Sequence, residues 1–300
     1  GYKFWPRQAE MFDSVWKNNL VCYGTGHKVG KTDMLCCLPV MWLLSHWPGF
    51  VLIIAADYRA LISKVMATIR ARVRAVENYL VSEHGSRFWL EDNVPQRDSW
   101  TLGDRWKLVL LSPDTPESVQ GYHSEGSQGG SLFIVEEASH LRQEIHDSLM
   151  SYADDPRNCV LYLGNPLKQD EPFAEILRQE RPETKRWHVG NISSWETPNS
   201  VATLEAIKRG ELTEADCWNG KEVVKKAGLA TWSFCQRYAS EHGEHSSQYQ
   251  VRVLGIVPSQ AEETYIGRDA TVEATNRPIP KDDQNPVMIC VDPAWSEVGD

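Results

Sequence analysis

Short apolar runs alternate with longer stretches of helical pattern along the first two thirds of the chain. The runs occupy residues 20–23, 51–56, 107–111, 131–135 and 160–163, and residues 185–189 are a candidate for a sixth. Helical patterns begin at Thr32 and cover residues 59–80. Apolar strands that alternate with helices indicate an α/β fold, in which helices flank both faces of a mainly parallel sheet. Ligands bind such sheets at the carboxyl ends of the strands, so functional residues are expected directly after these runs.

The pattern changes after about residue 191. Residues 202–209 and 222–226 look helical and residues 248–255 look like a strand, which predicts a smaller, mostly helical lid subdomain over residues 192–275 behind a core of residues 1–191. Turn-forming residues predict a hairpin or insertion at 86–105 and a linker at 276–285. The apolar run 287–291 predicts that another domain begins within residues 286–300. Because the chain starts with Gly1 and stops soon after this run, we expect a fragment.

Composition excludes several classes of protein. Of the 300 residues, 41% are hydrophobic and 24% are charged, as in ordinary globular proteins. The first residues lack the apolar segment of a secretion signal. The longest apolar stretch, residues 34–44, contains Pro39 and is shorter than the roughly 20 residues that span a bilayer, so it predicts a buried helix and no membrane partner.

Cysteine usage and charge add two further constraints. The seven cysteines are odd in number and form no CxxC pair, which indicates reduced thiols in a cytosolic protein. The net charge is −10, whereas contacts to nucleic-acid phosphates need lysine and arginine. Any DNA-binding surface is therefore small and locally basic, or lies partly outside this chain.

The clearest local motif follows the first apolar run. It resembles a Walker A phosphate loop, in which backbone N–H groups curl around phosphate, lysine faces the β- and γ-phosphates and a hydroxyl reaches Mg²⁺. Thr25 replaces the first glycine of that pattern. The alternative is a glycine-containing turn with a solvated lysine. The candidate nucleotide-binding residues are Thr25, Gly26, His27, Lys28, Val29, Gly30, Lys31 and Thr32.

An acidic pair ends the apolar run 131–135. Glu136 and Glu137 stand where a Walker B motif has its carboxylates. The first carboxylate of such a motif supports Mg²⁺, and the second orients the attacking water. Most families have aspartate first, so Glu136 adds one methylene. The alternative is a helix start enriched in glutamate, which the helix dipole favours.

Two amides are further candidates. Asn165 ends the run 160–163, where a polar side chain would lie beside the γ-phosphate and sense hydrolysis, although Gly-Asn-Pro is also a common turn. Gln8 near the front of the chain carries the donor and acceptor that match the edge of adenine. Its alternative is a surface glutamine on a first helix.

Taken in order, these segments resemble the large terminase subunit of tailed double-stranded DNA viruses, the ATPase that pumps DNA into procapsids. The resemblance extends from about Phe4 to Asp292. It is carried by residues 4–8, 29–32, 120–123, 135–139, 164–166, 195–199 and 249–255. It implies a P-loop NTPase core of the RecA/ASCE type with a small lid subdomain.

The resemblance also implies roles. Lys31 and Thr32 would bind phosphate and Mg²⁺ with ATP, Glu136 would support the metal, Glu137 would position water, and Asn165 would couple hydrolysis to movement. The partners would be double-stranded DNA, the portal protein and the small terminase subunit. The expected assembly is a homo-oligomeric ring on the portal, a pentamer by resemblance, in the cytoplasm of the infected host cell and outside the finished virion.

The end of the chain looks like the first strand of the terminase nuclease, an RNase H-like domain. Asp292 would be a ligand there for Mg²⁺ or Mn²⁺, one of several carboxylates needed for two-metal cleavage. The alternative is a simple Asp-Pro turn. Because the other ligands would follow Asp300, this chain alone is not expected to cut DNA.

Some features depart from the family pattern. Terminases often carry an arginine inside Walker A, where this loop has His27 and Lys28. An arginine finger from a neighbouring subunit could replace it, with candidates Arg70, Arg72, Arg74 and Arg105, each of which could equally be a solvated surface residue. Two other functions remain open: a helicase-like nucleic-acid ATPase, which would need a second RecA-like domain, and an inactive proviral relic.

Overall fold

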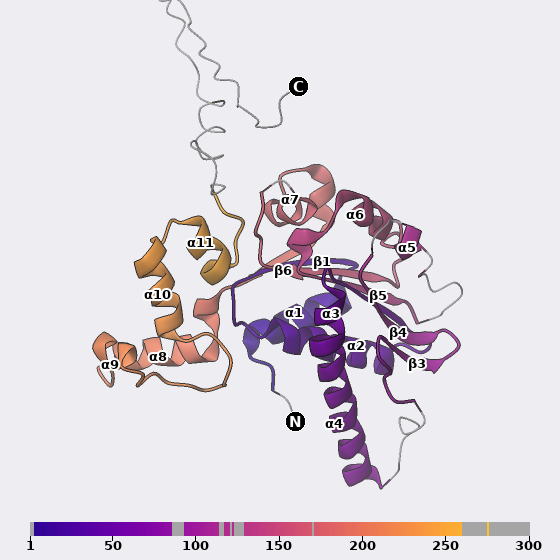
Figure 1. Cartoon of the computed structure of the whole chain (residues 1–300), viewed down its shortest axis with the longest axis horizontal. Coiled ribbons are helices and arrows are strands. Elements are labelled where there is room, and N and C mark those ends of the chain that lie inside the picture. Colours follow the sequence, from indigo (N-terminus) through magenta and orange to yellow (C-terminus); the bar gives the residue numbers. More distant parts are fainter. Residues whose placement is uncertain are drawn as a thin grey trace, which may run out of the picture.

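The computed structural model describes residues 3–85, 93–113, 117–120, 122, 129–169, 171–259 and 275. Figure 1 shows two parts: a sheet flanked by helices, and a group of short helices to one side of it. The expected linker 276–285, the following strand and Asp292 lie outside the described residues, as do Gly121 and His123 of the segment 120–123.

The sheet has seven strands in the order β3-β4-β2-β5-β6-β1-β7. Every neighbouring pair is parallel except β3 and β4, which form an antiparallel hairpin. All residues of β1, β2 and β6 are buried, as expected for parallel strands covered on both faces. This confirms the α/β fold with a mainly parallel sheet. The strands are β1 (Leu20–Thr25), β2 (Phe50–Ile54), β3 (Ser99–Gly103), β4 (Trp106–Leu111), β5 (Ser131–Glu136), β6 (Cys159–Gly164) and β7 (His188–Ile192).

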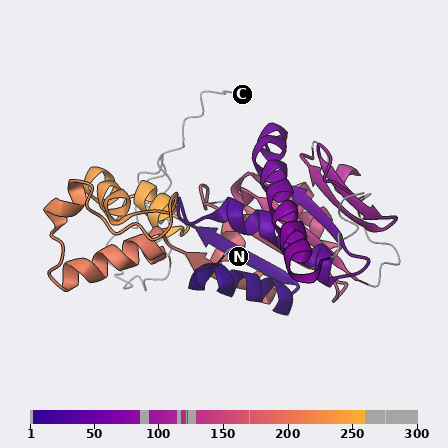
Figure 2. The same cartoon turned by 90° about the horizontal axis from the view of Figure 1, so that it is seen from below.

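Helices cover both faces of the sheet (Figures 1 and 2). Each face has its own cluster of buried apolar side chains, so the core consists of two layers separated by the sheet. The first face carries α1 (Pro6–Lys17), α2 (Lys31–Ser45) and a long continuous helix made of α3 (Tyr58–Ala60), the π-helical η1 (Leu61–Met66) and α4 (Ala67–His84). The second face carries α5 (Glu117–Gln120), α6 (Gln143–Met150) and α7 (Pro172–Arg178), with short 3₁₀ turns η3 (Ala138–His140) and η4 (Pro182–Arg186).

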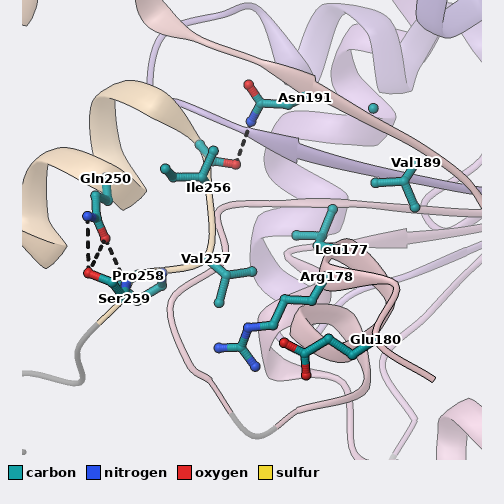
Figure 3. Close-up of a pocket in the computed structure, with 12 residues that line it drawn as sticks. Leu177, Arg178, Glu180, Val189, Asn191, Gln250, Ile256, Val257, Pro258 and Ser259 are labelled. Carbon is teal, nitrogen blue, oxygen red and sulfur yellow. Dashed lines mark hydrogen bonds between the residues drawn. The ribbon is translucent and has the colours of Figure 1, made fainter. Parts of the chain in front are cut away.

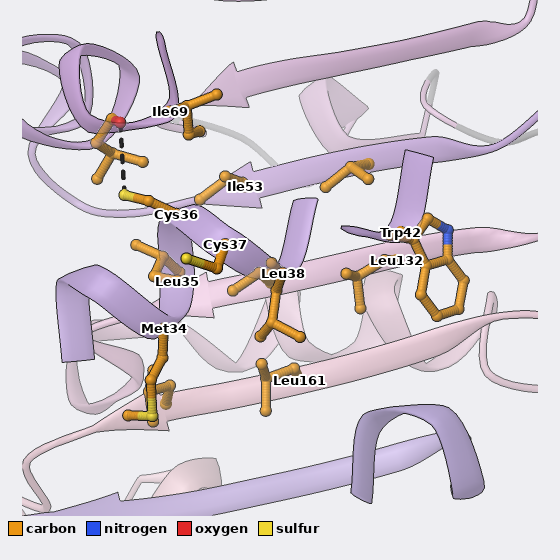
Figure 4. Close-up of a cluster of buried hydrophobic side chains, with 14 of the residues drawn as sticks. Met34, Leu35, Cys36, Cys37, Leu38, Trp42, Ile53, Ile69, Leu132 and Leu161 are labelled. Atoms are coloured by element: carbon orange, nitrogen blue, oxygen red, sulfur yellow. Dashed lines mark hydrogen bonds between the residues drawn. The ribbon is translucent and has the colours of Figure 1, made fainter. Parts of the chain in front are cut away.

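Helix α2 is the buried helix that the apolar stretch predicted. Figure 4 shows its side chains beside Ile53, Leu132 and Leu161 of the sheet and Ile69 of α4. Leu35 and Leu38 are fully buried, as are Ile53 and Leu132 of the sheet. Because α2 is apolar almost all round, tertiary burial rather than an amphipathic stripe fixes its place. It thereby holds the loop that precedes it against the sheet. Among the described helices, none is both long and apolar enough to cross a lipid bilayer.

A helical subdomain (residues 194–254) follows β7. It consists of η5 (Ser194–Glu196), α8 (Pro198–Lys208), α9 (Glu214–Trp218), α10 (Trp232–His242), α11 (Ser247–Tyr249) and the π-helical η6 (Gln250–Leu254). A small core of its own joins Phe234, Cys235, Tyr249 and Val253. Figures 1 and 2 agree that it lies to one side of the sheet, and this is the side on which β7 is the edge strand.

The strand expected at residues 248–255 was wrong. The Ser246 side chain accepts a hydrogen bond from the Tyr249 N–H and starts a helix, and Gly255 ends it with a φ of 70°. Val251 and Val253 alternate with polar residues, and this period of two is the pattern expected for a strand. The buried Tyr249 and Val253 are instead four residues apart, on one face of a helix.

Two smaller expectations also need correction. Residues 222–226 are not helical, because side chains bind the backbone there: the Asn199 Oδ1 accepts from the N–H groups of Lys225 and Lys226. The candidate strand 185–189 is shifted to His188–Ile192, since Pro182 begins a 3₁₀ turn that ends at Arg186. Within the expected hairpin or insertion 86–105, residues 99–103 form β3, which pairs antiparallel with β4, the strand expected at 107–111.

Candidate functional site

Three strand ends meet at one place in the sheet. Strand β6 lies between β1 and β5, so the turn after it is adjacent to both the phosphate loop and the acidic pair. Asn165 follows β6, Glu136 ends β5, and the loop from Gly26 to Gly30 follows β1. The order of the strands therefore brings together residues that are far apart in the sequence.

The loop ends in an anion-binding geometry. Gly30 caps α2 with a φ of 83°, a left-handed conformation that favours glycine, and no side chain caps the helix. The first N–H groups of a helix have no acceptor within it, and the helix dipole makes this end positive. Lys31 and Thr32 are the first two residues of α2. The start of α2 is thus suited to hold phosphate.

The Lys31 ammonium is held by the strand-end amide. Its Nζ donates to Asn165 Oδ1, and Asn165 Nδ2 donates to the Thr25 carbonyl. The Thr25 hydroxyl donates in turn to the Gly164 carbonyl at 3.1 Å. Threonine at the position of the first Walker A glycine therefore links β1 to β6, which glycine could not do.

Charge at the site is coupled across these strands. Burial lowers the pKa of Lys31 to about 8, while the carboxylates of Glu137 and Glu136 act in the opposite direction. Burial, with the neighbouring Glu137, raises the pKa of Glu136, while Lys31 acts to lower it. Desolvation disfavours the charged form of each group, and an incoming anion with its metal would favour the charged forms of both.

Glu137 is held in a strained backbone conformation. Its φ is 53° and its ψ 50°, which is uncommon for a residue other than glycine and is often found at functional sites. Gly164 makes room for this turn, because a Cβ there would lie 2.9 Å from the Ala138 nitrogen. A cavity of about 180 Å³ opens beside Glu136 and Glu137 at the ends of β2, β4 and β5, enough for several water molecules.

Ser139 joins the acidic turn to the strand-end turn. Its hydroxyl donates to the Asn165 carbonyl and accepts from the Leu167 N–H at 3.1 Å. The serine is buried. Sequence reasoning gave it no role, and the only available signal was a small hydroxyl residue two positions after the acidic pair.

Gln8 is not the surface residue that the alternative expected. Its exposed fraction is 0%, and its Nε2 donates to the Val29 carbonyl in the phosphate loop at 3.2 Å. A Cβ on Gly30 would lie 2.6 Å from that same Nε2. The Gln8 Oε1 is buried and, within the described part of the chain, has no partner. In this conformation the glutamine supports the loop from behind and retains one unused acceptor.

Strand β7 and the helical subdomain hold the front of the phosphate loop. The Gly26 and His27 N–H groups donate to the carbonyls of Ile192 and Arg252 at 2.8 and 2.7 Å. The Ser194 hydroxyl donates to the His27 carbonyl at 2.8 Å. The loop residues Gly26 and His27 therefore use their N–H groups here for protein contacts, and Ser194 and Arg252 were not found from the sequence.

His27 is neutral in this setting. Burial first, and then the nearby Lys31, Arg252 and Lys28, lower its pKa to about 4. The histidine therefore adds no charge to the loop at neutral pH. The positive groups gathered at this loop are Lys28, Lys31 and Arg252.

The candidate arginine fingers occupy different surroundings. Arg72 pairs with Asp33 in the first turn of α2, with its Nη2 at 2.7 Å. Arg70 donates to the carbonyls of Pro95 and Gln96. Arg74 and Arg105 are exposed. An arginine that acts on a neighbouring subunit must be exposed, which is true of Arg74 and Arg105. A role of either residue in trans stays an expectation.

A separate cavity lies on the outer side of β7. It has a volume of about 620 Å³ and is lined by α7, β7 and residues 255–259, where the chain leaves the helical subdomain (Figure 3). Asn191 fixes this junction by donating to the carbonyls of Leu254 and Gly255 at 3.0 and 2.7 Å. Because neither the phosphate loop nor the acidic pair lines it, this cavity is distinct from the candidate nucleotide site.

The fold is that of large terminase ATPase domains. The large terminase of a thermophilic bacteriophage superposes with a TM-score of 0.54 at 12% identity, over 86% of this chain and 55% of that protein. The same terminase in complex with ATP-gamma-S gives 0.51 at 12% identity, over 86% of this chain and 54% of that one. The large terminase ATPase domain of a Thermus phage gives 0.50 at 12% identity, over 84% and 93%.

These likenesses concern architecture. At 12% identity they show a shared fold, and this chain spans about half the length of the full thermophilic-phage terminase. No protein-family model and no curated protein matches the sequence. The chemistry of this chain must therefore follow from its own residues.

Proposed function

We propose that this chain is the ATP-hydrolysing motor of a large terminase, which moves double-stranded DNA into a viral procapsid. One observation carries the proposal: Lys31, Asn165 and the acidic pair meet at three adjacent strand ends in a fold shared with terminase ATPase domains. The thermophilic-phage terminase has been solved with ATP-gamma-S, which supports a triphosphate as the ligand of this fold.

The described residues fit a nucleotide with its metal. The uncapped start of α2 and the buried Lys31 offer positive charge to phosphate. The Thr32 hydroxyl and Glu136 would hold Mg²⁺, which neutralises charge on the phosphates. Magnesium bound with a nucleotide needs only one or two protein ligands, because phosphate oxygens and water supply the others.

Hydrolysis then depends on residues of this chain in defined roles. Lys31 binds the β- and γ-phosphate oxygens and remains mostly protonated at neutral pH, since its pKa is about 8. Glu137 accepts a hydrogen bond from the attacking water and orients it in line with the γ-phosphate. The strained turn at Glu137 fixes the direction of its side chain beside the cavity that has room for several water molecules.

Asn165 would couple hydrolysis to movement. In the described conformation its Oδ1 accepts a hydrogen bond from the Lys31 ammonium. A bound γ-phosphate is a stronger partner for that ammonium than a neutral amide. Asn165 would then be released, and the change would reach the acidic turn through Ser139 and β1 through Thr25.

The remaining parts of the proposal concern partners and the rest of the protein. The motor would act as a ring on the portal, with the small terminase subunit, in the cytoplasm of an infected host cell. Asp292 would contribute to a nuclease site with Mg²⁺ or Mn²⁺. The net charge of −10 leaves room for only a small basic DNA-binding surface on this part.

The deciding experiment is ATP hydrolysis by the complete protein with Mg²⁺, with and without linear double-stranded DNA and portal. Glu137→Gln should abolish hydrolysis and retain nucleotide binding, because it removes the group that orients water. Glu214→Gln is the matched control, since this carboxylate is exposed on α9 in the helical subdomain. Wild-type protein without hydrolysis under all these conditions would favour the relic, and unwinding of a duplex would favour the helicase-like ATPase.

A further inference from the structure

One lysine of the phosphate loop contacts an aromatic ring of the helical subdomain. The Lys28 ammonium lies 4.9 Å from the centroid of the Phe234 ring. The backbone of the same lysine is also held, because the Ala230 N–H donates to the Lys28 carbonyl at 2.8 Å. Lys28 has a φ of 55°, a left-handed conformation that is costly for lysine. The side chain and the backbone of this residue are thus both directed by residues 230–234.

The ring is buried, whereas the lysine is exposed. Phe234 is 8% exposed and packs in the small core of the helical subdomain, with its centroid 5.2 Å from that of Tyr238. Lys28 is exposed and, among the described residues, forms no salt bridge with a carboxylate. Its only described side-chain partner is a neutral π-face.

A phosphate would compete for the same ammonium. An exposed cation–π contact is weak, and a charge-assisted hydrogen bond to phosphate is stronger. Lys28 lies two residues before Gly30, the cap of the helix that is suited to hold phosphate. The flexible lysine stem can therefore exchange one partner for the other while the backbone stays in place.

We propose that Phe234 is a positioning residue that holds Lys28 away from the nucleotide, and that Lys28 exchanges this ring for a phosphate oxygen when a triphosphate binds. The inference rests on the proposed ATP site. The exchange removes one of the contacts between the loop and α10 and leaves the backbone hydrogen bonds intact. Binding of phosphate thereby weakens the contact between the phosphate loop and the helical subdomain.

The test is a double-mutant cycle on ATP-gamma-S binding in the presence of Mg²⁺. Phe234→Leu keeps an apolar side chain in the core and removes the π-face, so it should tighten binding about two- to fivefold. The gain should vanish in a Lys28→Met background, because no ammonium is left to release. Tyr238→Leu, in the same small core, is the matched control and should change affinity in neither background.

A spectroscopic readout separates positioning from mere packing. After reductive ¹³C-methylation, which keeps the charge, the Lys28 signal of the nucleotide-free protein should be shifted upfield by the ring. Phe234→Leu should abolish this shift, Tyr238→Leu should retain it, and ATP-gamma-S should remove it in the wild type. Persistence of the upfield shift in the saturated complex, or additivity in the cycle, overturns the inference.

The outcomes also separate this inference from the proposed function. If ATP-gamma-S binds and the cycle is non-additive but no hydrolysis occurs, the motor is refuted and the lysine exchange stands. If hydrolysis depends on Glu137 while the Lys28 signal is unshifted without nucleotide, the exchange is refuted and the motor stands. Absence of ATP-gamma-S binding refutes both.

Discussion

Gly26→Ala should separate the phosphate loop from the helical subdomain. A Cβ at Gly26 would lie 2.5 Å from the Ser194 hydroxyl and 2.5 Å from the Val253 carbonyl. The hydroxyl can rotate away, but the carbonyl belongs to the backbone of η6 and cannot. Relief therefore requires the loop and η6 to move apart. Glycine is required here because of this close approach, and not because of a left-handed backbone.

The expected cost follows from the contacts at that interface. Overpacking of a tightly packed site costs about 1–3 kcal/mol. Two hydrogen bonds bridge the interface at 2.7–2.8 Å, those from the His27 N–H to Arg252 and from the Ser194 hydroxyl to His27. Each contributes about 1 kcal/mol net, and partial loss is expected. The free energy of unfolding should fall by about 2–4 kcal/mol in total.

Thermal unfolding without nucleotide measures this effect. For a domain of this size the melting temperature should fall by roughly 5–15 °C. Gly103→Ala is the matched control, because a Cβ there meets nothing closer than the Trp106 Cβ at 3.7 Å and should cost no stability. A Gly26→Ala protein that melts with the wild type would show that the loop and the helical subdomain are not packed as described.

Three further predictions concern the amide and the two titrating loop residues. Asn165→Ala leaves the Lys31 ammonium and the Thr25 carbonyl without their partner, so unfolding free energy should drop by about 1–3 kcal/mol in a denaturant titration, and an unchanged midpoint refutes this. Burial lowers the pKa of Lys31 to about 8, so nucleotide affinity should fall as the pH rises past that value; Lys31→Arg, which keeps its charge, should not show the fall. Burial lowers the pKa of His27 to about 4 in the folded protein. As the pH falls from about 6.5 towards 4, the imidazole is therefore protonated in the unfolded chain before it is protonated in the folded one, and the free energy of unfolding decreases. His27→Asn should lose less stability over that range, by on the order of 1–2 kcal/mol after solvent screening, and equal acid-induced losses in the two melting curves would contradict it.

The sequence by itself determined the elements whose signal is local. The apolar runs at β1, β2, β5 and β6 are buried on both sides and need no alternation, so they were visible as continuous strands. The run at β4 was visible from its apolar residues, although only Leu108 and Leu110 are buried there. Helix α2 could be found from its apolar length, whereas the turn-forming residues 86–105 indicated only a hairpin or an insertion and did not identify β3. Gly30, Lys31, Glu136 and Glu137 could be proposed because their chemistry depends on spacing along the chain.

Elements that are stabilised by distant partners could not be found in this way. The segment 248–255 alternates like a strand, but its helical form is fixed by the Ser246 cap and by contacts with the phosphate loop. The segment 222–226 is not helical because backbone N–H groups in it donate to the Asn199 side chain. Secondary-structure propensity depends on neighbouring residues in the sequence, so it could not indicate either of these distant contacts.

The tertiary structure alone decided how the site is assembled. The order of the strands, which places β6 between β1 and β5, brings Asn165 to Lys31, and no spacing in the sequence requires it. Burial turns Gln8 towards Val29, and packing of the helical subdomain adds Ser194, Arg252 and Phe234 to the phosphate loop. The sequence determines which groups can do chemistry, because side-chain type and backbone freedom are local properties. Which of those groups meet depends on free energies of packing and hydrogen bonding between segments that only the folded chain brings together.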